Sequence, residues 1–143
     1  MKQMMKNKKA IAVLLLVAML FSIMPTAVFA ESNLETTTAY VTIVDKGEIV
    51  VTHKAVTVDK ENANIDDFLK QAHEEYFEGG ATAGYTSEKG QWSLSIKKLW
   101  GDTSGSFGYC VNNASASSLA DQVKNGDHVV AYVYKDQTNW SDV

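Results

Sequence analysis

The chain has 143 residues with 13 lysines, no arginine and 17 acidic residues, which gives a formal net charge of −4. This length suits one ordinary domain. The acidic balance speaks against a nucleic-acid partner, because such a partner requires a basic surface. Cys110 is the single cysteine, which excludes an internal disulfide and a cysteine-rich metal site.

The N-terminal segment has the features of a secretory signal peptide. Lysines between Lys2 and Lys9 precede an apolar run of fourteen residues, 10–23, and compact side chains then precede a cleavage position after Ala30. The apolar run is shorter than the about 20 residues that a transmembrane helix needs. We therefore expect a signal peptide over residues 1–30 and a secreted, extracellular product that does not stay inserted in the membrane.

The sequence after the signal peptide begins with a polar lead-in over residues 31–38, which precedes a domain over residues 39–143. Alternating β-branched residues predict strands at 39–44 and 48–58, joined by a glycine-containing turn. The apolar phase of the second strand changes midway, which predicts a β-bulge near residues 52–55.

An amphipathic helix is predicted over residues 65–77. Asn64 can cap it, since its side-chain oxygen can accept a hydrogen bond from the first turn. Asp66 and Asp67 favour the same start through the helix dipole, and a glycine pair beginning at Gly79 ends the helix. The apolar stripe that we expect to face a sheet comprises Ile65, Phe68, Leu69, Ala72 and Tyr76.

The segment that follows the helix is predicted to be a loop up to Gly90, because it is rich in small residues. Trp92 then alternates with Leu94 and Ile96. This alternation predicts a half-buried strand over residues 92–97 with Trp92 in the core.

Two further strands are predicted at residues 106–112 and 128–134, separated by an irregular segment at 114–124. The last strand is apolar on both faces, which favours a central position in a sheet. The order is ββαβββ, and we expect an α+β, β-grasp-like fold in which one helix packs on a mixed five-stranded sheet. The last strand would lie parallel to the first. An immunoglobulin-like sandwich is the competing architecture, but it has no place for this helix.

With these elements placed, the chain resembles the transcobalamin-like C-terminal domain family over residues 40–136. The marks are the helix entry at residues 64–69, the segment 101–113, and the closing segment 125–134. The resemblance implies a β-grasp-like domain that occurs as a module of surface proteins in Gram-positive bacteria. It also implies cobalamin as a candidate ligand, because the namesake of the family contacts a corrinoid with this domain.

Three functions are compatible with the sequence. The first is a non-enzymatic binding or interaction module whose partner is a small molecule or a cell-surface protein or glycan. The second is a cobalamin-binding protein. The third is a hydrolase that uses Cys110 as nucleophile, His128 as base and Asp127 as the orienting carboxylate, for which a buried strand cysteine is the simpler interpretation.

The three histidines give no metal-binding pattern. His53 and His128 stand alone in predicted strands, and His73 has no second histidine four residues away on its helix. The acidic loop at residues 59–64 lacks the glycine and the final glutamate of a calcium loop. We therefore expect no metal site.

Aromatic side chains with neighbouring amides are the best candidates for a binding surface. Trp100 is expected to be exposed because it precedes Gly101 in a turn, and loops carry function more often than strands do. An apolar patch is also expected on the sheet face that the helix leaves uncovered, formed by Val44, Val50, Val130, Tyr132 and Tyr134. The candidate ligand-binding residues are Trp100, Tyr109, Asn112, Asn113, Tyr132 and Tyr134.

Overall fold

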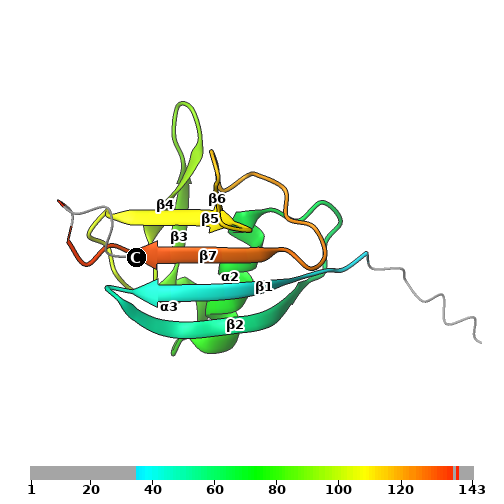
Figure 1. Ribbon diagram of the computed structural model, residues 1–143, viewed down its shortest axis with the longest axis horizontal. Coiled ribbons are helices and arrows are strands. Elements are labelled where there is room, and N and C mark those ends of the chain that lie inside the picture. The colour runs from blue at the N-terminus through cyan, green and yellow to red at the C-terminus, as the bar shows by residue number, and fades with distance from the viewer. Residues whose placement is uncertain (1–34, 137, 139–143) are drawn as a thin grey trace, which may run out of the picture. The chain divides into compact units, whose positions relative to one another are not determined.

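The computed structural model describes residues 35–136 and 138 (Figure 1). Five strands form a mixed sheet in the order β2-β1-β7-β5-β6, and β3 pairs with β4 in a separate two-stranded sheet. The predicted signal peptide and the first four residues of the lead-in, 31–34, lie outside the described residues. The elements are β1 (Thr37–Asp45), β2 (Glu48–Val58), α2 (Ile65–Tyr76), α3 (Gly80–Gly84), β3 (Thr86–Lys89), β4 (Leu94–Lys98), β5 (Phe107–Val111), β6 (Ala114–Ser115) and β7 (His128–Val133).

The architecture confirms the predicted class, an α+β fold in which one main helix packs on a mixed five-stranded sheet. Strand β7 lies between β1 and β5, parallel to the first and antiparallel to the second. Val129 and Ala131 of β7 are fully buried under the helix side of the sheet. The central position of the last strand, and its parallel pairing with the first, are therefore as the two apolar faces predicted.

The predicted bulge lies in β2. The register with β1 shifts between Val41 and Ile43, whose partners are Lys54 and Val51. His53 takes a left-handed φ of 43° within this irregularity. In a regular strand, odd- and even-numbered residues face opposite sides of the sheet. The extra residue shifts this alternation, so that Val51 and Val56 are both buried.

Helix α2 begins as predicted. The side chain of Asn64 accepts a hydrogen bond from the Asp67 N–H at 2.9 Å, and the Asp67 carboxylate accepts one from the Asn64 N–H at 3.0 Å. This reciprocal pair satisfies two donors that the first turn would otherwise leave free. The stripe is buried from Ile65 to Ala72.

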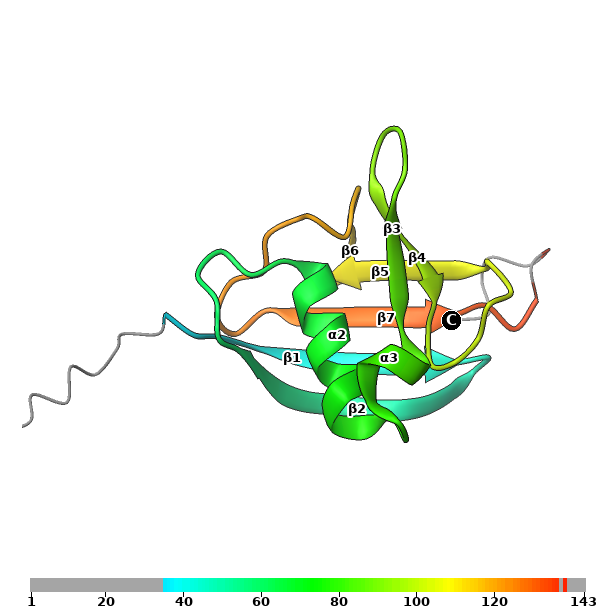
Figure 2. The same ribbon diagram turned by 180° about the vertical axis from the view of Figure 1, so that it is seen from behind.

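Tyr76 is the exception in the stripe, because its side chain is 40% exposed. Figure 2 shows α2 crossing the sheet toward the edge strand β2, so that the last turn of the helix has little sheet beneath it. The stripe prediction is therefore wrong at its final residue.

The segment between α2 and β5 differs most from the prediction. The expected loop up to Gly90 contains the short helix α3 and the strand β3, and the expected strand starts at Leu94 rather than at Trp92. Strand β4 pairs with β3 alone. The fifth strand of the main sheet is instead β6, two residues long, in the segment that was expected to be irregular.

Candidate functional site

One face of the main sheet carries no described helix. Figure 1 views this face, with α2 and α3 behind the sheet, and Figure 2 shows both helices on the opposite side. We call it the open face. Its side chains alternate with the buried ones along each strand. They are Tyr40, Thr42 and Val44 of β1, His128, Val130 and Tyr132 of β7, and Gly108 and Cys110 of β5.

An aromatic pair occupies one end of the open face. The rings of Tyr132 and Tyr134 are 5.0 Å apart between centroids and meet edge to face, at 84°. The Tyr134 hydroxyl donates a hydrogen bond to the Tyr132 hydroxyl at 3.3 Å. Burial raises the pKa of Tyr132. Both rings are half-buried, so they offer apolar faces together with hydroxyl groups.

Gly108 makes the position of the Tyr132 ring possible. The two residues are opposite one another in the β5–β7 ladder, and a Cβ at position 108 would overlap the ring. The missing side chain therefore lets the ring lie flat over the β5 backbone. Glycine within a strand often marks such a close approach.

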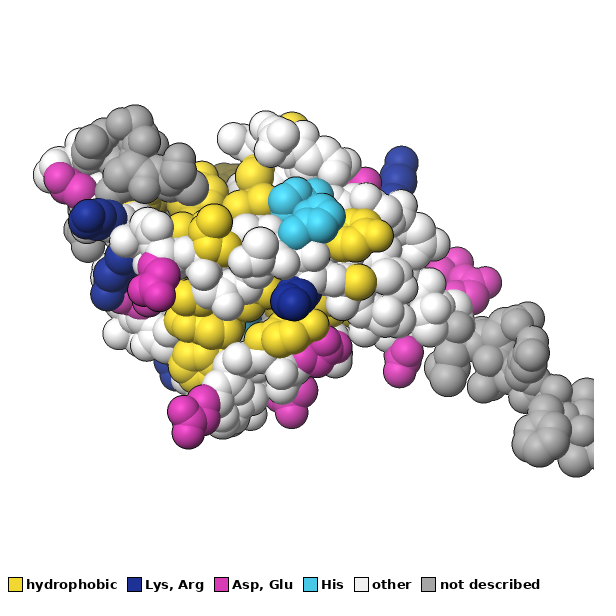
Figure 3. Space-filling model, turned by 60° about the horizontal axis from the view of Figure 1, so that its bottom comes forward, with side chains coloured by type: hydrophobic (Ala, Val, Ile, Leu, Met, Phe, Trp, Pro, Cys, Tyr) yellow, Lys and Arg dark blue, Asp and Glu magenta, His cyan; other side chains and the backbone are white. Residues whose placement is uncertain are grey.

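Two histidines occupy the other end of the open face. The His53 ring stacks on Tyr40 with centroids 4.4 Å apart and meets His128 edge to face at 4.6 Å. Thr42 Oγ1 joins them, since it accepts the His53 main-chain N–H at 3.0 Å and lies 2.8 Å from His128 Nε2. Burial and the neighbouring His53 ring lower the pKa of His128. Figure 3 shows exposed histidine side chains among hydrophobic ones.

The hydrolase hypothesis required Cys110, His128 and Asp127 to act together. The Asp127 carboxylate instead accepts hydrogen bonds from the Asn112 side-chain amide at 2.9 Å and the Lys124 main-chain N–H at 2.8 Å. The His128 ring instead contacts Thr42, whose Oγ1 lies 2.8 Å from Nε2. Burial raises the pKa of the Cys110 thiol, which opposes formation of the nucleophilic thiolate. The residues therefore lie on neighbouring strands without the contacts of a nucleophile–base–carboxylate set.

The six candidate ligand-binding residues fall in three places. Tyr132 and Tyr134 lie on the open face, at one end of β7. Asn112 and Asn113 form the tight turn between β5 and β6, with left-handed φ values of 50° and 64°. Asn112 also closes the other end of β7, since its Oδ1 accepts the His128 N–H at 2.9 Å.

Tyr109 and Trp100 form the third group. Tyr109 stands opposite Ala131 and packs against the core, on the helix side of the sheet. Trp100 is half-buried, with its ring edge to face with Phe77 at 4.9 Å. The expectation that Trp100 is the exposed aromatic is therefore wrong, because the turn that contains it folds back onto α2.

The prediction that Trp92 lies in the core is also wrong. Trp92 stands in the loop between β3 and β4 and is 90% exposed. The alternation with Leu94 and Ile96 suggested a core position, but the chain turns at residues 90–93, before the strand begins. A turn signal at Gly90 was present in the sequence, and it was the one observation that could have separated Trp92 from the strand.

The apolar patch on the open face is smaller than expected. Val44, Val130, Tyr132 and Tyr134 are half-buried side chains of β1 and β7 or its end. Val50 packs against the core, at the second register shift of β2, where Ile43 pairs with Val51 and Val44 with Ile49.

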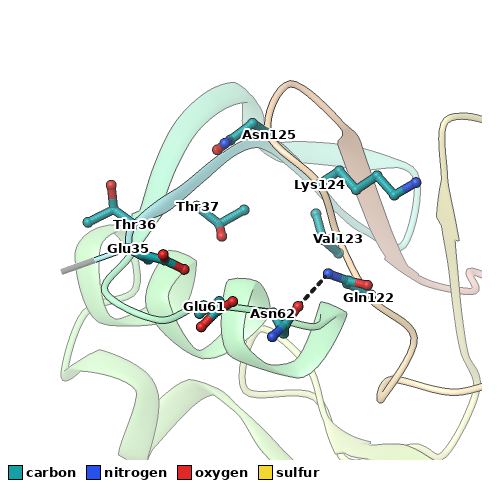
Figure 4. Close-up of a pocket in the computed structure, with 9 residues that line it drawn as sticks. All are labelled: Glu35, Thr36, Thr37, Glu61, Asn62, Gln122, Val123, Lys124 and Asn125. Atoms are coloured by element: carbon teal, nitrogen blue, oxygen red, sulfur yellow. Dashed lines mark hydrogen bonds between the residues drawn. The ribbon is translucent and has the colours of Figure 1, made fainter. Parts of the chain in front are cut away.

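A polar concavity of about 410 Å³ lies at the start of β1 (Figure 4). The Asn62 side-chain Oδ1 accepts a hydrogen bond from the Gln122 side-chain amide at 3.0 Å across this concavity. The loop at residues 59–64 thus forms one wall of this concavity. Its last residue, Asn64, also caps α2. The lining residues are Glu35, Thr36, Thr37, Glu61, Asn62, Gln122, Val123, Lys124 and Asn125.

Metal ligands do not gather among the described residues. Across residues 35–136 and 138, no group of three or more histidine, cysteine or acidic side chains is placed to hold a metal ion. His73, the third histidine, is fully buried. It contacts Leu69, Trp100 and nearby rings rather than the other two histidines.

Among the described helices, none has the length and apolar character to cross a membrane. No protein-family model matches the sequence, and no curated protein matches it either.

Proposed function

We propose that this chain is a secreted, non-enzymatic binding module, β-grasp-like and of the transcobalamin-like C-terminal type, that recognises its partner through the open face. The observation that carries the proposal is the Tyr132–Tyr134 pair, held edge to face on a part of the sheet that no described helix covers. The resemblance over residues 40–136 and the predicted signal peptide support the extracellular setting.

The chemistry of the open face suits binding better than catalysis. Tyrosines bind through large apolar faces and hydroxyl groups, and they lose little side-chain entropy because few bonds rotate. Tyr132 is already held against Gly108 and Tyr134, so part of that ordering cost is met before a partner arrives. The partner class that fits is a cell-surface protein or glycan with a flat surface, and cobalamin is the small-molecule candidate that the resemblance names.

The test uses the chain from Glu31 onward, which contains the compact unit with all the buried core residues. Thermal unfolding is measured with cyanocobalamin and with a panel of cell-wall glycans, since a ligand of the folded state raises Tm. Binding is then compared in Tyr132→Ala and in the control Tyr76→Ala, which removes an exposed tyrosine from α2, away from the open face.

We expect a loss of affinity of about tenfold or more in Tyr132→Ala, and an unchanged affinity in the control. Light scattering on the same samples measures self-association, which would make a second copy the partner. A monomeric protein to which nothing in the panel binds, or an equal loss in both variants, would contradict the assignment to the open face.

A further inference from the structure

Trp92 is the most exposed large hydrophobic side chain among the described residues, at 90%. It stands at the tip of the β3–β4 hairpin, which projects beyond β5 in both ribbon views (Figures 1 and 2). Burying an indole is among the most favourable contributions a side chain makes to folding. Trp92 makes almost none of that contribution, so the fold itself does not explain why a tryptophan stands there.

The tip that carries Trp92 is held in place by the main chain. The Gly90 N–H donates to the Ser93 carbonyl at 2.8 Å, which closes the turn between the two strands. The Leu119 N–H donates to the Leu94 carbonyl at 3.1 Å, which ties the start of β4, directly after the turn, to the segment before β7. Trp92 is therefore presented by a closed turn on an anchored hairpin.

A concavity of about 330 Å³ lies beside the indole. The hairpin tip forms one wall, and Ser118 and Ala120 form the other. Ser118 Oγ accepts the N–H groups of Leu94 at 3.3 Å and Ala120 at 3.1 Å. Since both of these bonds use its lone pairs, the hydroxyl proton of Ser118 is left to donate to a ligand.

We propose that this concavity binds a neutral saccharide, with Trp92 as the surface on which a pyranose ring stacks. The C–H groups on one face of such a ring carry partial positive charge, which the negative face of the indole attracts. The hydroxyl groups around the ring need neutral donors and acceptors, and Gln91, Ser93 and Ser118 line the same concavity.

Charge and size separate this ligand from the alternatives. The lining contains Lys89 and no carboxylate, which disfavours a cation, and one exposed lysine is a weak basis for binding an anion. A stable protein interface buries about 800 Å² on each partner, whereas this site consists of one hairpin tip and a short facing segment. The volume lies at the lower end of the range for small-ligand sites.

This site goes beyond the proposed function, because it stands on the β3–β4 hairpin and shares no residue with the open face. The experiment titrates the chain from Glu31 with chitotriose, cellotriose and mannotriose, and follows tryptophan fluorescence and calorimetric heat. At least one trisaccharide should shift the emission to shorter wavelength, because stacking removes the Trp92 ring from water.

Three variants test the assignment. Trp92→Ala should weaken binding by about tenfold or more without changing Tm, Trp92→Phe should retain part of the affinity, and Ser118→Ala should weaken it through the lost hydroxyl. Tyr132→Ala is the control, since it disables the open face alone. Absence of binding by all three trisaccharides, or equal binding by Trp92→Ala and the unmodified chain, would overturn the proposal whatever the open face binds.

Discussion

His73 and Trp100 are joined by a partly buried hydrogen bond, in which the Trp100 main-chain N–H donates to His73 Nε2 at 3.0 Å. Because that N–H can only donate, Nε2 holds a lone pair and the ring proton is on Nδ1. Nδ1 lies 2.6 Å from the Leu69 carbonyl, to which it donates. The fully buried imidazole is therefore neutral, and it links the last turn of α2 to the turn after β4.

Stability should fall as the pH drops below about 6.5, the ordinary pKa of histidine. Burial lowers the pKa of His73 in the folded chain, so between that lowered value and about 6.5 the unfolded chain binds a proton that the folded chain does not. The contribution of His73 is therefore complete above about 6.5 and is lost as the pH decreases toward the folded pKa.

Urea unfolding at several pH values measures this dependence. His73→Gln removes the titrating ring and should flatten the decline toward acidic pH, at some cost in stability at neutral pH. His128, whose pKa is also lowered, contributes to the remaining slope, which His73→Gln/His128→Gln should reduce further. Identical slopes in the unmodified chain and in His73→Gln would show that the buried ring does not control acid stability.

The two described tryptophans should differ sharply in their effect on stability. Trp100 packs against His73 and Phe77, so Trp100→Ala should lower the free energy of unfolding by about 2 kcal/mol or more. Trp92→Ala should change it by about 0.5 kcal/mol or less, because the side chain is 90% exposed. Urea unfolding of both variants decides the matter, and equal losses would mean that the exposures are wrongly assigned.

Local chemistry was enough to predict the helix and the central strand. Helix α2 is defined mostly by its own residues. The Asn64 side-chain oxygen caps its start, two acidic residues follow in the first turn, and apolar residues recur every three or four positions. The two apolar faces of β7 likewise carry the information that neighbours lie on both sides. The change of apolar phase in β2 located the bulge, because a period of two cannot shift without an extra residue.

The errors arose where contacts between residues far apart in the sequence determine exposure and strand pairing. Alternation from Trp92 to Ile96 does not reveal where a hairpin turns, nor whether a strand joins the main sheet. Trp100 is half-buried because His73, 27 residues earlier, accepts its N–H. The same limit applied to the candidate site, where the sequence placed Tyr132 and Tyr134 on one face but could not show that Gly108 lies beneath the ring.

Gly108→Ala should destabilise the open face. The new methyl group would overlap the Tyr132 ring, and either the ring or the β5 backbone must move, at a cost of about 1–3 kcal/mol. Gly90→Ala is the matched control, because a Cβ there meets only an ordinary contact at 3.4 Å and the position has no left-handed φ.

Thermal unfolding compares these two variants with Tyr132→Ala and with Gly108→Ala/Tyr132→Ala. The second substitution removes the ring that the methyl group displaces, so the double variant should lose less stability than the two single effects add up to. Strict additivity would indicate that Gly108 and Tyr132 do not touch in solution.

Cys110 should behave as a slowly reacting thiol. Burial raises its pKa, although a main-chain hydrogen bond from Asn113 offsets part of the rise, and only the thiolate reacts. Alkylation by iodoacetamide should therefore be slower at neutral pH than that of a free cysteine, with a midpoint above the usual value of about 8.5. In urea the rate should return to that of the free amino acid, which controls for access. Faster reaction at neutral pH than in urea would identify an activated nucleophile, and only that result would favour the hydrolase over the binding module.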